Sequence, residues 1–190
     1  LPNWEADGVE EFAYVHIGPY VDEMAETYTS AVNGMLPESP LLIVGQTTAV
    51  DPSRTPNDEH ILWVQVRTLP SEIEGDAAGE IEATSWDEAG EPFADRVIEK
   101  LESYAPGVSE SIIDREVITP DDLERSNPNL VGGDSVGGSH HLRQNFIWRP
   151  FGDWNDYETP VTDLYMVGAA TWPGAGVNAI SGYQAAQKLT

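Results

Sequence analysis

The chain has 190 residues, of which 40% are apolar, and its six tryptophans and seven tyrosines indicate a folded protein with a sizeable core. A net charge of −24, from 33 acidic and nine basic side chains, argues against nucleic acid as a partner. The absence of cysteine excludes disulfides, thiolate metal sites and cysteine nucleophiles.

The acidic side chains have two interpretations. One is an ordinary solvated surface. The other is a halophile-type protein, because the composition resembles that of salt-loving archaea, and concentrated salt suppresses self-repulsion between like charges. No apolar run has the length of a membrane span and the first residues are acidic, so we expect a cytoplasmic protein, with peripheral membrane contact left open. A first residue of Leu1 rather than Met suggests a processed product or a fragment.

Hydrophobic periodicity predicts the elements of the first half of the chain. Residues 9–18 alternate as a strand does, and 20–35 have apolar residues at helical spacing. The runs 41–50 and 60–69 are apolar and β-branched, and a Pro- and Asp-containing turn separates them, which predicts an antiparallel hairpin. Residues 71–92 are expected to form an acidic loop.

The next segments continue this pattern up to an irregular region. One helical face of apolar residues predicts a helix at 91–104, and SESIIDREVIT predicts a strand at 109–119. A short helix is expected after Thr119 as its cap, with Pro120 in the first turn. From about residue 127 to 160 the chain is rich in Gly, Asn, Pro and aromatic residues, and such a long irregular stretch is typical of functional or disordered segments.

The C-terminal segment predicts a strand at 164–167, a turn of small residues and a helix at 177–189. Within it, GAGVNA at 174–179 fits the G-x-G-x-x-G/A dinucleotide pattern, which needs a preceding strand, a following helix, a second strand and a later acidic residue. Only the first two conditions are met. The alternative is a tight turn in which Gly174 and Gly176 serve backbone geometry alone.

Three other patterns are weaker. GGDSVGG at 132–138 is similar to the nucleophile region of trypsin-like proteases, but Val136 interrupts it and the disulfide framework is missing. Adjacent His140 and His141 would face opposite sides of a strand, so a metal site is disfavoured. The acidic loops lack the ligand order of calcium sites. We therefore predict no metal ion.

A series of motifs in the second half carries a family resemblance. TPDDLERSNPNLVGGD and then HHLRQNFIWRPFGDWNDYETPVTDLYMVGAATWPGAGVNAISGYQAA resemble the C-terminal end of the phytoene desaturase-like flavin oxidoreductases, which include carotenoid desaturases, isomerases and pyridine nucleotide-disulphide oxidoreductase-like relatives. The match covers about residues 105–190. The matching positions are Thr119, Pro120, Asp122, Leu123, Glu124, Gly132, Gly133, Gln144, Arg149, Pro150, Trp154, Tyr157, Thr159, Pro160, Leu164, Tyr165, Gly168, Thr171, Pro173, Gly174 and Gly176.

This resemblance implies an FAD-dependent oxidoreductase acting on an apolar, isoprenoid- or carotenoid-like substrate. It implies that the flavin end of FAD lies at the terminal turn, whose backbone amides would face the cofactor. The family's own FAD-binding glycine fingerprint precedes the matched region and is absent here, and Ala170 replaces a common glycine. No catalytic side chain is implied, because the flavin accepts the electrons. The implied cofactor-binding residues are Gly168, Ala169, Thr171, Pro173, Gly174, Ala175, Gly176, Val177 and Asn178.

The sequence thus predicts an α+β fold in two parts. Residues 1–126 would form a substrate-domain-like portion, a mixed or antiparallel sheet with helices on one face, and 127–190 the C-terminal strand, turn and helix of a Rossmann-type FAD-binding domain. The missing N-terminal portion would be a partner, and apolar surface left exposed without it would favour a homodimer. The aromatic set Phe146, Trp148, Phe151, Trp154 and Trp172 would line a substrate tunnel or pack a core.

Two alternatives stay open. The chain could be a stand-alone, non-catalytic binding or interaction domain that keeps the terminal turn for structure. It could also belong to an amine-oxidase-like flavoprotein acting on a C–N bond. In the fragment interpretation we expect the chain alone to be inactive and to hold FAD weakly.

Overall fold

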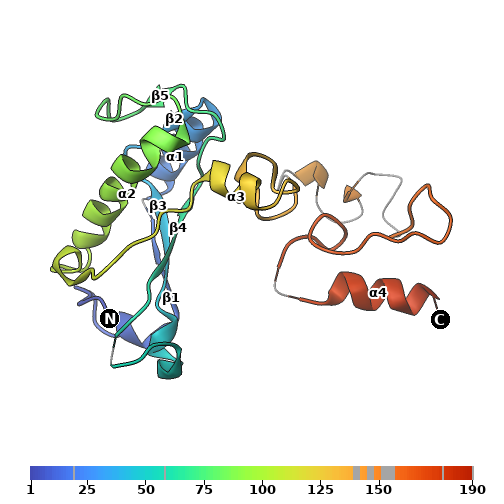
Figure 1. The fold of residues 1–190 in the computed structure, drawn as a ribbon, viewed down its shortest axis with the longest axis horizontal. Helices are drawn as coiled ribbons and strands as arrows, with labels where there is room; N and C mark the ends of the chain where they lie inside the picture. Colours follow the sequence, from blue (N-terminus) through green and yellow to red (C-terminus); the bar gives the residue numbers. More distant parts are fainter. Residues whose placement is uncertain are drawn as a thin grey trace. The chain divides into compact units, whose positions relative to one another are not determined.

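The computed structural model describes residues 1–18, 20–57, 59–138, 142–144, 148–150, 157–176 and 178–189. The chain forms two compact units, Leu1–Asp121 and Asp122–Thr190. The functional domains expected at 1–126 and 127–190 stay a prediction. The fold is α+β, as the sequence predicts, with a small antiparallel sheet and four α-helices among the described residues (Figure 1).

A three-stranded sheet forms the centre of the first unit. Its order is β1 (Tyr14–Ile17), β3 (Leu41–Gly45) and β4 (Trp63–Arg67), and both pairings are antiparallel. The hairpin expected from 41–50 and 60–69 is therefore confirmed, although the strands are shorter and two 3-10 helices, Thr47–Ala49 and Pro52–Arg54, lie in the connection. The residues 9–18 are only partly a strand, because Val9–Glu11 is a 3-10 helix.

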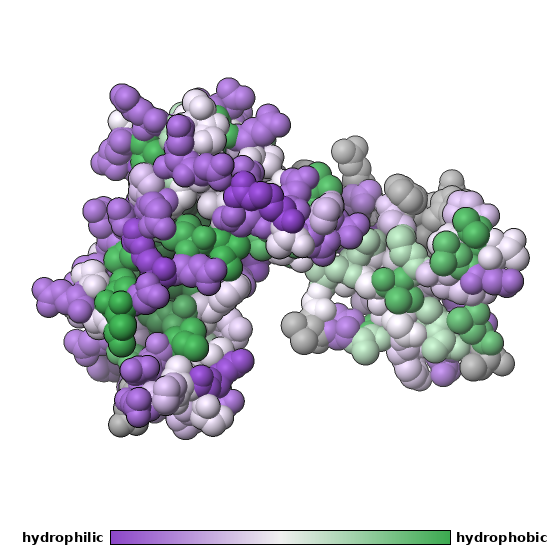
Figure 2. Space-filling view, in the orientation of Figure 1, coloured by the Kyte–Doolittle hydropathy of each residue, from purple (hydrophilic) through white to green (hydrophobic). Residues whose placement is uncertain are grey.

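One face of this sheet packs against the helix α2 (Trp86–Glu102). Leu42 and Val44 point into the core from alternate positions of β3, and Phe93 and Trp86 meet them from the α2 side with their rings edge to face at 6.1 Å. Each fully buried side chain of this size contributes about 1.5–3 kcal/mol by leaving water. Hydrophilic residues cover much of the visible surface of this unit, with hydrophobic ones gathered in its middle (Figure 2).

The helix α2 begins earlier than the sequence predicts. The expected acidic loop at 71–92 ends at Ser85, and Pro92 lies inside the helix instead of near its start. A proline inside a helical pattern argues for a boundary, but burial of Trp86, Ala89 and Gly90 on the same face extends the helix across it.

The remaining helix and strands of the first unit surround this core. The helix α1 (Val21–Val32) confirms the prediction for 20–35 and contacts β2 (Met35–Leu36), which pairs in parallel with β5 (Gly75–Asp76). Neither short strand is predicted from the sequence. The strand expected at 109–119 is wrong, because Ser109–Ser111 is a 3-10 helix and the residues after it pair with no strand among the described residues.

Two helices of the second half match their predictions. The helix α3 (Pro120–Ser126) begins directly after Thr119, and α4 (Ile180–Leu189) begins three residues later than expected. Single 3-10 turns lie at Val131–Gly133 and Leu142–Gln144. The strand expected at 164–167 is wrong: only one bridge forms, between Glu158 and Tyr165, because no neighbouring strand of the described chain is available for a ladder.

Candidate functional site

The candidate cofactor turn connects the Glu158–Tyr165 bridge to α4. Thr171 anchors it from inside: this residue is 1% exposed, and its amide and hydroxyl both donate to the carbonyl oxygen of Gly168, at 3.1 and 2.9 Å. The amide of Gly174 then donates to the carbonyl of Thr171 at 2.7 Å. The structure therefore brings Gly168, Thr171 and Gly174 into one compact turn.

Glycines permit the shape of this turn. Gly168 and Gly174 have φ values of +123° and +108°, which residues with a Cβ atom rarely adopt. Gly168 is exposed, and a Cβ there would meet nothing within 4 Å, so the space beside it is open to a ligand.

Two side chains near the start of α4 accept hydrogen bonds from backbone amides. The side-chain oxygen of Asn178 accepts from the amide of Ile180 at 3.0 Å, and Ser181 Oγ accepts from the amide of Gly168 at 3.1 Å. The amides of Ile180 and Gly168 are therefore occupied and cannot donate to a bound ligand. Asn178 thus forms a local side-chain turn that satisfies the first amide of α4, and Ser181 is a contact residue that the sequence analysis missed.

Other backbone amides stay available. Within the described part of the chain, the amides of Ala175, Gly176 and Ala179 donate no hydrogen bond, and Gly176 and Ala179 are exposed. Ala169 is exposed as well and its carbonyl faces inward, toward Arg149. Val177 lies outside the described residues. The turn therefore contains exposed peptide groups whose amides have no acceptor in the described part of the chain.

A tyrosine behind the turn connects it to α4. The hydroxyl of Tyr157 lies 3.0 Å from the carbonyl oxygen of Trp172 and 2.6 Å from Oε1 of Gln184, and the residue is buried. The ammonium of Lys188 lies 5.9 Å from the centre of its ring. Tyr157 is in the resemblance, but the sequence offers no signal for Gln184, because contact across 27 residues depends on the fold.

The weaker sequence patterns have ordinary roles where the structure describes them. The carboxylate of Asp134 accepts from the amides of Val136 (2.9 Å) and Gly138 (2.5 Å), so the GGDSVGG run is a turn held by its own side chain. His140, His141, Phe146, Phe151 and Trp154 lie outside the described residues. Trp148 is half exposed and Trp172 is partly buried, so neither encloses a tunnel by itself. No cluster of metal-ligating side chains occurs among the described residues.

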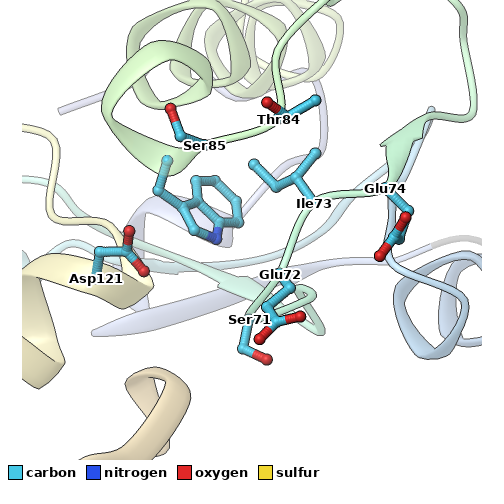
Figure 3. Close-up of a pocket in the computed structure, with 8 residues that line it drawn as sticks. Ser71, Glu72, Ile73, Glu74, Thr84, Ser85 and Asp121 are labelled. Carbon is cyan, nitrogen blue, oxygen red and sulfur yellow. The ribbon is translucent and has the colours of Figure 1, made fainter.

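A shallow hollow of about 340 Å³ lies in the first unit, away from the predicted turn in sequence. Ser85 and Thr84 line it at the start of α2, with Glu72, Glu74 and Asp121 around it (Figure 3). A lining that includes three carboxylates makes a poor site for an apolar substrate. None of the predicted cofactor residues belongs to this hollow.

Three relatives show what the chain is similar to. Pyridine nucleotide-disulfide oxidoreductase domain-containing protein 2 of Rattus norvegicus is 32% identical over 162 residues, which cover 85% of this chain and 26% of that protein. A limonene dehydrogenase polypeptide of Castellaniella defragrans is 30% identical over 75% of this chain and 25% of its own length. The lycopene-forming phytoene desaturase of Pantoea ananas is 32% identical over 51% of this chain and 19% of its own.

The chain is similar to phytoene desaturase-like oxidoreductases. This agrees with the resemblance seen in the motifs. The chain spans about a quarter of the length of the rat relative. No family model matches it. Among the described residues, no helix combines the length and apolar character that a membrane crossing requires.

Proposed function

We propose that this chain is the C-terminal, flavin-contacting portion of an FAD-dependent oxidoreductase of the phytoene desaturase-like type. The observation that carries the proposal is the turn at 168–176, where peptide amides without a hydrogen-bond acceptor among the described residues and positive-φ glycines coincide with the motifs shared with that family. Its residues are those implied by the resemblance, from Gly168 to Asn178, with Ser181 added as a support.

FAD, when bound, would supply the electron acceptor for the reaction. The turn would contribute hydrogen-bond donors at the ring edge, and the start of α4 would favour negative charge there by about 0.3–1 kcal/mol. Asn178 has a second role in this arrangement. It occupies the amide of Ile180, whereas the amides of Ala175, Gly176 and Ala179 have no acceptor among the described residues and would be available to the ligand.

We further propose an apolar isoprenoid- or carotenoid-like substrate, from which hydride is removed or which is isomerised. The names of the relatives support this class, since limonene and phytoene are both hydrocarbons. A hydrocarbon offers no group that needs an acid or base, and the flavin would accept the electrons. The protein would orient the substrate and exclude water.

The remaining part of the FAD site would come from a separate stretch of polypeptide, which we propose as the partner of the second unit. The relatives are about four times as long as the matched segment. The second unit leaves large apolar side chains exposed, which such a partner would cover: Val161, Leu164, Tyr165, Met166, Val167, Ile180, Tyr183 and Leu189. A second copy of the chain is the alternative cover.

The visible absorption of the intact gene product tests this function. Bound flavin bands, together with turnover of a carotenoid precursor, would support it, and turnover of amines instead would favour the amine-oxidase-like alternative. A colourless intact product that binds no FAD would overturn the proposal in favour of a non-catalytic binding domain. Titration of the 190-residue chain alone with FAD should show weak binding. A submicromolar affinity for FAD would contradict the fragment interpretation.

A further inference from the structure

Arg149 is the largest fully buried side chain in the described part of the chain, with an exposed fraction of 2%. Among the described residues, its guanidinium donates to four backbone carbonyls. Nε reaches Ala169 at 3.0 Å, Nη1 reaches Gln144 at 3.2 Å, and Nη2 reaches Val136 at 3.2 Å and Gly137 at 2.8 Å. A charge buried at this depth is tolerated only when several groups solvate it, and here peptide oxygens take the place of water.

These four carbonyls come from three segments that are separate in the sequence. Val136 and Gly137 belong to the GGDSVGG turn, Gln144 to a 3-10 helix, and Ala169 to the proposed flavin turn. The planar guanidinium carries five N–H donors in a fixed fork, so it can hold segments in set directions as a flexible ammonium cannot. Arg149 therefore ties the flavin turn to a second glycine-rich loop.

Two glycines show how closely these segments approach. A Cβ on Gly137 would lie 3.0 Å from the amide nitrogen of Ala170 and 3.1 Å from the carbonyl carbon of Ala169. A Cβ on Gly174 would lie 3.6 Å from the side chain of Arg149. The backbone at 169–170 is thus packed against Gly137, and the guanidinium lies beneath the turn.

The direction of the Ala169 carbonyl decides that of the next amide. Because the peptide group is planar and trans, a carbonyl held inward by Arg149 turns the N–H of Ala170 away from the guanidinium. Ala170 is exposed, and its amide donates no hydrogen bond within the described residues. The resemblance places a glycine of the family at this position, so the orientation of this peptide matters for a cofactor that approaches the turn.

We propose that Arg149 is a positioning residue for the flavin-facing turn, acting through the Ala169–Ala170 peptide and the 136–137 loop. That the ligand is FAD rests on the proposed function. That Arg149 positions the turn does not depend on it. The site is then built from two loops, and Gly137 joins the residues that set its shape.

The substitution Arg149→Lys tests the proposal. Lysine keeps the positive charge, but its single ammonium group cannot hydrogen-bond to four separated carbonyls. In the 190-residue chain, the amides of Gly168, Thr171 and Gly174 should exchange with solvent about tenfold faster or more than in the wild type. In the intact gene product, FAD should bind about tenfold more weakly, with a shifted flavin absorption band. Arg125→Lys, at an exposed arginine of the same unit, is the matched control and should change none of these.

A second variant approaches the same peptide from its other side. Gly137→Ala should also speed exchange at Thr171 and Gly174, because its methyl group meets the 169–170 backbone. Gly79→Ala introduces the same backbone strain, since the φ values are +72° and +70°, but it faces open space in the first unit. It should leave the turn unchanged.

If the amides of the turn exchange at the wild-type rate in both Arg149→Lys and Gly137→Ala, the positioning role of Arg149 is overturned. The same holds if Arg149→Lys shifts neither the flavin band nor the affinity of a gene product that does bind FAD. A wild-type product without flavin would instead overturn the proposed function, while the exchange measurements would still decide the role of Arg149. Should Arg149→Lys unfold the second unit, the Gly137→Ala and Gly79→Ala pair decides alone.

Discussion

Asp76 and Arg96 form a buried ion pair in the first unit, with side chains 1% and 9% exposed. Both oxygens of Asp76 lie 2.6 Å from the guanidinium nitrogens, and one also accepts from the amides of Glu80 and Ile81. Burial raises the pKa of Asp76, but these hydrogen bonds and the charge of Arg96 outweigh it and hold the pKa well below its usual range. The pair joins β5 to α2.

We expect Asp76→Asn to lower the free energy of unfolding by about 3–5 kcal/mol, because it leaves Arg96 buried without its charged partner. Since the folded pKa lies below the unfolded one, the stabilisation is present above about pH 4 and is lost as the pH falls further. Denaturant titration at neutral and acidic pH measures both effects. Asp95→Asn, in an exposed pair with Arg115, is the control and should cost about 1 kcal/mol or less.

Gly176 is a second position where a single substitution tests the role of the turn. Its φ is +150°, and a Cβ there would lie 2.9 Å from the side-chain nitrogen of Asn178. We predict that Gly176→Val displaces the Asn178 side chain from the amide of Ile180 and removes the flavin colour of the intact gene product. Gly182→Val in the interior of α4, where a Cβ meets nothing within 4 Å, is the comparison. Equal colour in the Gly176 variant and the wild type would count against the turn as a cofactor site.

At the scale of elements, the buried side-chain amide of Gln46, directly after β3, binds the N-terminal segment. Gln46 accepts from the indole of Trp4 at 2.9 Å and donates to the carbonyls of Val9 and Phe12 at 2.8 and 2.7 Å. Gln46→Glu keeps the shape but removes both donors and sets a carboxylate against two carbonyls. We expect it to cost about 1–3 kcal/mol or more and to release residues 4–12 to proteolysis.

Gln65→Glu is the matched control for that variant. The side chain of Gln65 accepts a hydrogen bond from Arg67 at 3.1 Å, and a carboxylate can accept it as well. Equal protease sensitivity of the two variants would show that Gln46 does not hold the segment.

Helix α2 carries an exposed proline in its interior. Pro92 cannot donate to the carbonyl four residues before it, and a proline costs about 3 kcal/mol relative to alanine inside a helix. Pro92→Ala should therefore raise the melting temperature. Pro120→Ala, at the first residue of α3 where proline is tolerated, should change it little. A lower melting temperature for Pro92→Ala would contradict the view that Pro92 destabilises α2.

The net charge of −24 acts on the whole molecule. The screening length falls from about 10 Å at 0.1 M salt to about 3 Å at 1 M, so salt should weaken repulsion among the carboxylates and raise the melting temperature. Replacing the exposed Glu10 and Glu11 by glutamine should reduce this dependence on salt. A melting temperature that is constant from about 0.1 to 1 M salt would exclude self-repulsion as a significant destabilising effect.

Much of the architecture could be predicted from the sequence because it depends on local periodicity. The hairpin at 41–69, the helices α1 and α4 and the α+β class all follow from apolar spacing and turn residues. The errors occur where tertiary contacts outweigh local preference. Burial extends α2 across Pro92, and the β-branched residues after Ser109 form no strand because no partner strand lies beside them in the described chain.

By itself, the sequence determined the class of fold, the family resemblance and the small-residue turn at 168–176, because spacing and residue type carry that information. The tertiary structure alone decided which amides of the turn are occupied by Asn178 and Ser181, and which stay open. It also placed Arg149 beneath two loops that are more than thirty residues apart. Such contacts depend on where the folded chain brings distant carbonyls together, and no local pattern of residues encodes that.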